Sequence, residues 1–208
     1  MQCSLCSSKT NFFSKERNRD YYHCPNCDGI LMDPENYLSS LEEKACYEEH
    51  NNDVNDIRYQ NFVSPIVNGV IKHYNKTHRG LDFGAGPGPV ITKLLRDIGY
   101  NIYLYDPYFY NNQSLLKSKY DYIVCSEVAE HFYSPKEEFA FLRTLLKEKG
   151  SLFIMTSLYS NSINFNTWHY KNDPTHVFFY SKKTMEFIKG KYDFKNIKIK
   201  NNLIHLSI

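Results

Sequence analysis

From residue 79 onward the chain alternates between short apolar stretches and amphipathic stretches. Four stretches have the length and apolar character of strands: 81–83, 101–105, 121–126 and 151–156. Apolar side chains recur at helical spacing from Val90 to Ile98. The same spacing recurs in 135–147, which begins with Ser134 and Pro135 as cap and first turn. The alternation predicts an α/β fold in which helices flank a sheet.

The stretch 40–78, ahead of the first strand, predicts helices in at least two pieces. Ser39 or Ser40 suits the N-cap of the first piece, because a serine hydroxyl accepts a hydrogen bond from the first helical turn. A break is expected at 50–53, where polar residues cluster, and Pro65 suits the start of the next piece. We expect these helices to pack on one side of the core.

The last stretch, 182–208, predicts one helix and two strands, with Asn201-Asn202 in the turn of a closing hairpin. Between Lys182 and Lys200 it carries seven lysines against Glu186 and Asp193. One interpretation is a solvated helix and an edge strand that lysines protect from pairing. The other is a patch that faces phosphates.

Four cysteines form two pairs, Cys3-x2-Cys6 and Cys24-x2-Cys27, with 17 residues between the pairs. This spacing is typical of a zinc site. Each short turn points two thiolates at one ion, and four thiolates leave no open position for a catalytic water. A module of residues 1–39 buries too little apolar surface to fold alone. We therefore predict a zinc ribbon that a structural zinc ion stabilises.

Length and charge limit the alternatives only coarsely. A chain of 208 residues with a formal net charge of +2 suits one mid-sized domain with a small appended module. That charge neither requires nor excludes nucleic acid. The sequence opens without a basic and apolar leader, and no apolar run approaches the roughly 18 residues of a membrane helix. We expect a cytoplasmic protein without a membrane partner.

The first strand runs into a glycine-rich turn, and the residues of this region are Leu81-Asp82-Phe83-Gly84-Ala85-Gly86-Pro87-Gly88-Pro89-Val90. A dinucleotide site would show G-x-G-x-x-G, with helix amides free to bind a pyrophosphate. Here the pattern is G-x-G-x-G, and Pro87 and Pro89 remove two N–H donors. A ligand without phosphates, such as S-adenosylmethionine, fits better. Asp106 ends the second strand 22 residues beyond Gly84, near the distance at which an acid binds ribose hydroxyls.

Three stretches together resemble the class I S-adenosylmethionine-dependent methyltransferases: 81–90, Tyr105-Asp106-Pro107 and 121–131. The chain is also similar to a subgroup in which a zinc ribbon precedes the methyltransferase domain. The resemblance implies a Rossmann-like methyltransferase sheet with flanking helices. It also implies three parts: a zinc ribbon at 1–39, a helical connector at 40–78 and a methyltransferase domain at 79–208.

By the same resemblance, eight residues would surround the cofactor: Asp82, Gly84, Ala85, Gly86, Gly88, Asp106, Ser126 and Glu127. Asp82 and the glycine-rich turn would surround the methionine part of the cofactor, and Asp106 would hold its ribose. Ser126 and Glu127 would line the cleft near the sulfonium. Only 14 residues separate Asp106 from Asp121. We therefore expect the next strand of the family's sheet and its helix to be shortened.

Methyl transfer needs a base only when the acceptor must lose a proton. Glu127, Glu130 and His131 stand at i, i+3 and i+4, which places them on one face if a helical turn follows the strand. They would then bind a divalent metal or hold the acceptor. The alternative is that Glu130 and His131 form structural hydrogen bonds behind the cofactor cleft.

The stretch 166–180 is dense in aromatic and polar side chains, at the point where a loop should leave the carboxyl edge of the sheet. Ligands of open α/β sheets bind at that edge. We expect an acceptor pocket in which Trp168 stacks and His169 and His176 provide acid–base chemistry or orientation. The alternative is a packed loop in which His176 satisfies backbone groups.

These observations predict an enzyme that transfers a methyl group from S-adenosylmethionine to a small-molecule acceptor of the sugar or metabolite type. The first alternative is methylation of ribosomal or transfer RNA, with the ribbon and the basic stretch Lys182 to Lys200 on the phosphate backbone. The second alternative is a non-catalytic module that binds a cofactor or a protein. Intact Gly84, Gly86, Gly88 and Asp106 argue against the second.

Overall fold

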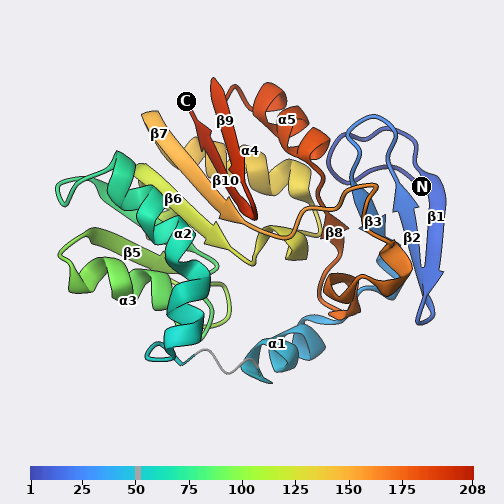
Figure 1. Ribbon diagram of the computed structural model, residues 1–208, viewed down its shortest axis with the longest axis horizontal. Helices are drawn as coiled ribbons and strands as arrows, with labels where there is room; N and C mark the ends of the chain where they lie inside the picture. Colours follow the sequence, from blue (N-terminus) through green and yellow to red (C-terminus); the bar gives the residue numbers. More distant parts are fainter. Residues whose placement is uncertain (50–52) are drawn as a thin grey trace.

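A six-stranded sheet forms the centre of the computed structural model, which describes residues 1–49 and 53–208 (Figure 1). The strand order is β5-β4-β6-β7-β10-β9. The strands are β4 (Arg79–Phe83), β5 (Asn101–Tyr105), β6 (Tyr120–Ser126), β7 (Leu146–Met155), β9 (Asn196–Lys200) and β10 (Leu203–Ser207). The first four in chain order pair in parallel, and β10 is antiparallel to both neighbours. The predicted Rossmann-like methyltransferase sheet is thereby confirmed.

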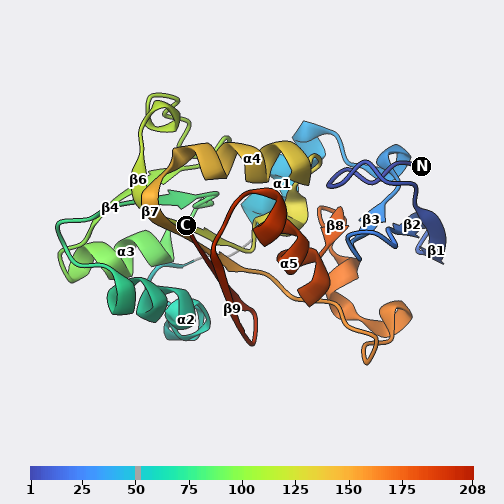
Figure 2. The same ribbon diagram turned by 90° about the horizontal axis from the view of Figure 1, so that it is seen from above.

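Helices cover both faces of this sheet (Figure 2). On one face, α2 (Ile57–His73) and α3 (Val90–Asp97) bury Ile66 and Leu95 in one core with Phe153. On the other face, α4 (Pro135–Leu145) and α5 (Lys182–Lys191) bury Phe139 and Ile188 in a second core. Both cores rest on the apolar strand residues that the sequence pattern places in the interior.

The segment between β5 and β6 is short, as expected. Among the described residues it contains only a single 3-10 turn, Leu115–Lys117, and no strand lies beyond β5 in the sheet. The loop after Asp106 folds back on itself instead, because Asp106 and Tyr110 exchange backbone hydrogen bonds. The sheet therefore ends at β5, directly beside the turn that follows β4.

The prediction that Pro65 starts a helix is wrong. The helix α2 begins at Ile57, where Asp56 caps it by accepting a hydrogen bond from the backbone of the first turn, and Pro65 lies inside it. A proline there leaves the carbonyl of Asn61 without its usual donor. The Ser64 hydroxyl donates to that carbonyl at 2.7 Å and so replaces the missing bond.

The first helix, α1 (Ser40–Glu49), lies below the carboxyl edge of the sheet (Figure 1). Ser39 caps it as predicted: the Glu42 carboxylate accepts from the Ser39 N–H at 2.9 Å, and the Ser39 hydroxyl accepts from the Glu42 N–H at 3.4 Å. The break expected at 50–53 falls largely on 50–52, which lie outside the described residues. None of the helices that the structure describes is long and apolar enough to cross a membrane.

The N-terminal cysteine module forms a second, four-stranded sheet. Its strands are β1 (Asn11–Glu16), β2 (Arg19–His23), β3 (Ile30–Met32) and β8 (Phe178–Phe179), all antiparallel. The last strand comes from the far end of the chain. The two sheets are therefore joined through the segment that leads from β7 to α5, and residues 1–39 do not complete the small sheet by themselves.

The basic stretch ends at the outer edge of the large sheet. In β9, which is the edge strand, Lys198 and Lys200 occupy exposed positions that alternate with half-buried isoleucines. This arrangement agrees with lysines that protect an edge strand.

Candidate active site

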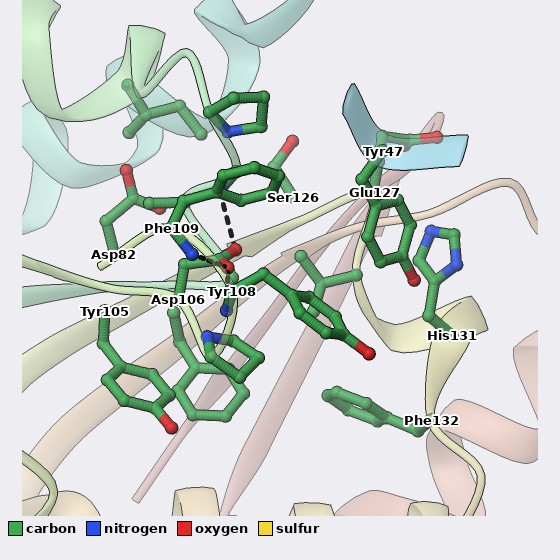
Figure 3. A pocket seen from close by; sticks show the side chains of 18 of the residues that line it. Tyr47, Asp82, Tyr105, Asp106, Tyr108, Phe109, Ser126, Glu127, His131 and Phe132 are labelled. Carbon is green, nitrogen blue, oxygen red and sulfur yellow. Dashed lines mark hydrogen bonds between the residues drawn. The ribbon is translucent and has the colours of Figure 1, made fainter. Parts of the chain in front are cut away.

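A cavity of about 970 Å³ opens at the carboxyl ends of β4, β5 and β6. Its walls come from the glycine-rich turn, the loop after β5, the segment after β6, and the helices α1 and α2. Small-molecule sites span about 300–1,000 Å³, so this cavity has room for a cofactor and an acceptor together. Figure 3 shows Asp82 and Asp106 on one side and Tyr47, His131 and Phe132 on the other.

The glycine-rich turn approaches the cavity with backbone alone. Gly84 has φ +77°, and a Cβ built on it would lie 2.5 Å from Val128 Cγ2. Gly86 has φ +63°. Side chains are excluded at Gly84 by both conformation and space, because L-residues rarely adopt positive φ. This cradle fits a ligand that rests against the main chain.

Asp106 joins the glycine-rich turn to the loop after β5, two segments that line the cavity. Its carboxylate accepts hydrogen bonds from the backbone N–H groups of Gly86 at 2.9 Å, Tyr108 at 2.8 Å and Phe109 at 3.1 Å (Figure 3). The side chain is nearly buried and still lines the cavity. The predicted ribose-binding acid therefore stands beside the glycine-rich turn, at the edge of the sheet where the predicted ligand would lie.

Asp82 lies beneath the same turn and is almost completely buried, although it contributes to the cavity lining. Burial raises the pKa of its carboxyl to about 6, although the Thr92 hydroxyl donates a hydrogen bond to it at 2.7 Å. The negative charge of Asp106 adds to the rise of this pKa. An ionised Asp82 therefore costs folding free energy at neutral pH.

This cost leads to a prediction for Asp82→Asn. A folded-state pKa above the unfolded value stabilises the fold at low pH, and the benefit is lost as pH rises through about 6. The variant should therefore match the wild type near pH 4 and exceed its unfolding free energy by about 2 kcal/mol at pH 8. Denaturant titrations at the two pH values measure this gap. A stability difference between the variant and the wild type that shrinks with rising pH would contradict a raised pKa for Asp82.

Farther from the glycine-rich turn, the carboxylates of two glutamates contact the hydroxyl of the same tyrosine. The Tyr170 hydroxyl donates to Glu127 at 3.2 Å and makes a short contact with Glu130. Glu130 is completely buried and also accepts from the Thr156 hydroxyl at 2.9 Å. Burial, followed by the charge of Glu130, raises the pKa of Glu127 to about 8. Glu127 faces the cavity from a left-handed backbone conformation, φ +51°.

The two histidines that line the cavity have fixed orientations. His131 Nδ1 lies 3.0 Å from the Thr175 carbonyl, and His176 Nδ1 lies 2.7 Å from the Tyr170 carbonyl. Their rings meet edge to face with centroids 4.8 Å apart. The structure therefore brings together His131 and His176, which the sequence places on separate segments.

Other residues of the predicted acceptor loop lie elsewhere. His169 is exposed and does not line the cavity. Trp168 is 92% covered and packs in an aromatic cluster with Phe165 and Phe179. The loop makes two short 3-10 turns, Phe165–Thr167 and His169–Asn172, which direct neighbouring side chains to opposite sides. Sequence reasoning missed Tyr170, whose hydroxyl reaches the two glutamates, because aromatic density does not reveal direction.

Sequence reasoning also missed the contribution of α1. Glu43 is buried and accepts hydrogen bonds from the Tyr47 and Tyr108 hydroxyls, each at 2.7 Å. Tyr47 also packs edge to face on His131, with centroids 5.3 Å apart. The helix is thus tied both to the loop that follows Asp106 and to the histidine wall. The sequence around Glu43 has no apolar periodicity, so it did not indicate that α1 would line the cavity.

The charge of the cavity has a single sign. Seven acidic residues line it: Glu43, Asp82, Asp106, Glu127, Glu137, Glu138 and Asp173. Among the lining residues that the structure describes, none is a lysine or an arginine. Such a wall attracts cations and repels phosphates.

The four paired cysteines converge at the other end of the molecule. Cys3 and Cys27 have their sulfurs 3.6 Å apart, Cys6 and Cys24 3.3 Å, and all four lie within 4.8 Å. A tetrahedral zinc shell with bonds of about 2.3 Å places sulfurs about 3.8 Å apart. The donor set therefore fits a zinc ion.

The two cysteine turns have the same backbone. Ser7 N–H donates to Cys3 O at 2.8 Å, and Asp28 N–H donates to Cys24 O at 2.8 Å. Ser7 and Asp28 both adopt positive φ, +61° and +64°. Two equivalent turns thus present their thiolates to one point, which is what the spacing predicts.

Residues of the small sheet also hold the loop by which His176 reaches the cavity. The Arg19 guanidinium of β2 donates to the carbonyls of Asn172 and Asp173, each at 3.3 Å. Lys171 is buried and lies 3.6 Å from the Glu16 carboxylate of β1. The loop that carries His176 is therefore fixed by residues of the cysteine module.

We expect Arg19→Met to disturb this loop. It removes two hydrogen bonds to backbone carbonyls and should cost on the order of 1–3 kcal/mol of unfolding free energy. The KM for the acceptor should rise, while affinity for S-adenosylmethionine, which we expect at the glycine-rich turn, stays unchanged. Arg17→Met, an exposed residue of the same hairpin with the same loss of charge, is the matched control. If Arg19→Met and Arg17→Met change the unfolding free energy and the acceptor KM equally, Arg19 does not hold the loop in place.

A family model described as a methyltransferase domain matches residues 26–199. The chain therefore belongs to this family of methyltransferases, and the predicted methyltransferase class is confirmed. A search of curated proteins finds no match.

Solved structures share the fold at low identity. A SAM-dependent methyltransferase of Archaeoglobus fulgidus matches with a TM-score of 0.53 and 19% identity, over 72% of this chain and 94% of that one. An O-methyltransferase family protein of Burkholderia thailandensis matches at 0.51 and 12%, over 74% and 60%. A protein of Nostoc punctiforme assigned as an O-methyltransferase matches at 0.51 and 11%, over 72% and 56%. The chain thus spans little more than half the length of the last two.

Proposed function

We propose that the protein transfers a methyl group from S-adenosylmethionine to a small acceptor that is neutral or positively charged. The observation that carries this proposal is a continuous cavity that extends from the glycine-rich turn to His131 and His176 and whose described lining residues include seven acids and no lysine or arginine. The cofactor itself carries a sulfonium, and its methionine part an ammonium group. An acidic cavity suits both.

On the cofactor side, the proposed contacts follow from the geometry. The backbone of Gly84, Ala85, Gly86 and Gly88, which lines the cavity, would hold the methionine part, and at Gly84 there is no room for a Cβ. Asp106 would accept from the ribose hydroxyls, and Asp82 would support the turn from below. Ser126 and Glu127 would line the cleft between cofactor and acceptor. The cofactor supplies an activated methyl carbon.

On the acceptor side, the chain's residues would position the nucleophile and exclude water. Tyr47, Tyr108 and Phe132 form an aromatic wall next to His131 (Figure 3). Desolvation and alignment contribute much of the rate in such a displacement. If the acceptor loses a proton, His131 and His176 would accept it when no metal ion occupies them, and Glu127, whose pKa is raised to about 8, would accept it only when ionised at higher pH.

RNA methylation remains the alternative function. The acidic wall disfavours a phosphate backbone at the cavity mouth. The basic stretch Lys182 to Lys200 lies on α5 and the edge strand β9, at the far edge of the sheet from the β5 loop. A small acceptor is therefore the better fit.

We also propose that Cys3, Cys6, Cys24 and Cys27 bind one structural zinc ion. The support is the spacing of their sulfurs and the equivalence of their two turns. Through Arg19 and β8, this ion would stabilise the loop that carries His176.

The test incubates purified protein and methyl-tritiated S-adenosylmethionine with extract from cells that lack the gene. The extract is then separated into RNA, protein and small molecules, and the small molecules are separated by charge. We expect protein-dependent label in neutral or cationic small molecules. Label in RNA would establish RNA methylation as the function. Label in anionic small molecules would contradict the proposal that the acidic cavity selects neutral or cationic acceptors.

A further inference from the structure

We propose that Glu130, His131 and His176 bind one divalent metal ion at the acceptor end of the cavity. One candidate ligand atom from each of the three residues lies within 4.8 Å of the others. This site is separate from the cysteine cluster, and its occupant would take oxygen and nitrogen ligands. The proposed role of the ion in acceptor binding rests on the proposed function, but metal binding itself does not.

The two imidazoles present the nitrogens that a metal needs. A backbone carbonyl only accepts hydrogen bonds, so the carbonyls of Thr175 and Tyr170 fix the proton of each ring on Nδ1. The Nε2 atoms of His131 and His176 then carry lone pairs. Metal-binding histidines are commonly oriented in this way, with the second ring nitrogen bonded to a carbonyl or a carboxylate.

The surroundings of His176 Nε2 call for a cation. This atom lies 4.0 Å from Glu130 Oε1 and 3.7 Å from Asp173 Oδ2. A nitrogen lone pair that faces the Glu130 carboxylate repels it, and a positive charge between the two atoms, a metal ion or a proton on Nε2, removes this repulsion. Among the described residues, Glu130 forms no ion pair with lysine or arginine, although it is completely buried.

The carboxylate is held in place from behind. The Thr156 hydroxyl and the Tyr170 hydroxyl both bond to Glu130, while His131 and His176 line the cavity in front of it. A divalent ion about 2.1 Å from each ligand atom would draw the three atoms together by about 1 Å, a movement that side-chain rotation allows. Its remaining positions would face the cavity, where an acceptor oxygen could bind.

The test titrates the zinc-loaded full chain with Mn²⁺ and follows free Mn²⁺ by electron paramagnetic resonance. Mn²⁺ prefers oxygen and nitrogen ligands and does not compete for the cysteine thiolates. We expect one bound Mn²⁺ per chain, with affinity at least tenfold lower in His176→Gln and in His131→Gln. His169→Gln, an exposed histidine of the same loop, is the matched control and should bind like the wild type.

Folding is checked for each variant by its zinc content and its thermal melt. If the wild-type protein binds no Mn²⁺, the metal site is rejected, and a proton on His176 would then balance the charge of Glu130. Unchanged binding in folded His176→Gln and His131→Gln would overturn it as well. If the protein binds Mn²⁺ but transfers no methyl group to any molecule in the extract, the metal site stands and the proposed function is rejected. If it transfers methyl groups but binds no Mn²⁺, the proposed function stands and the metal site is rejected.

Discussion

Replacement Cys24→Ser is expected to abolish binding of the proposed zinc ion and make the protein insoluble. Structural zinc contributes about 10–16 kcal/mol of apparent free energy in small zinc modules, far more than the apolar surface of such a module supplies. Without the ion, β3 should separate from β8, which leads directly from the His176 loop. The measurements are zinc content by atomic emission and the soluble fraction after expression.

Cys46→Ser provides the control, because Cys46 lies on α1, outside the cysteine cluster, and is only half-buried. It should keep zinc and solubility. A Cys24→Ser protein that retains one zinc per chain and folds normally would show that the ion is not structural, whatever else the cluster does.

Replacement Gly84→Val is expected to abolish binding of S-adenosylhomocysteine. The new Cβ would lie 2.5 Å from Val128 Cγ2, at a backbone φ of +77°. Positive φ costs a non-glycine residue about 1–2 kcal/mol, and overpacking typically adds 1–3 kcal/mol. The added side chain would also displace Val128, which lines the cavity. At 100 times its Kd the ligand should raise the wild-type Tm by about 5–10 °C, and the variant should show no shift.

Gly190→Ala is the matched glycine replacement, because a Cβ at Gly190 meets nothing within 4 Å. It should melt at or above the wild-type temperature and keep the full ligand shift. If Gly84→Val does not fold, Gly84→Ala gives the smaller perturbation on which the shift is measured. A normal shift in either Gly84 variant would place the cofactor elsewhere.

Sequence alone predicts the features that depend on neighbouring residues. The strands, the turn at Gly84 and the paired cysteine turns follow from local spacing and from the conformational limits of glycine and proline. The short loop after Asp106 is equally local, because few residues cannot form another strand and helix. Each of these agrees with the structure.

Sequence predicts less where distant segments decide the outcome. Pro65 fits a helix start by itself, but Asp56 caps an earlier one and Ser64 offsets the missing hydrogen bond. The pairing of β3 with β8 joins segments about 150 residues apart, for which no local pattern exists. The helix α1 likewise reaches the cavity only through tertiary contacts.

The acceptor loop shows the same limit at the level of single side chains. The stretch 166–180 is correctly placed at the carboxyl edge, yet only His176 of its three predicted residues lines the cavity. Trp168 packs inward, His169 faces solvent and Tyr170 meets the glutamates. Successive 3-10 turns set these directions, and they have no periodicity that sequence reasoning can use.

Equilibrium dialysis of the zinc-loaded protein against methyl-tritiated S-adenosylmethionine tests most directly whether this cavity holds the methyl donor. We predict that about one molecule is retained per chain and that excess S-adenosylhomocysteine displaces it, because both share the parts that Gly84, Gly86 and Asp106 would contact. Retention no greater than that of Gly84→Val would contradict the assignment of the cavity. The protein would then have the methyltransferase fold without a methyl donor bound in this cavity.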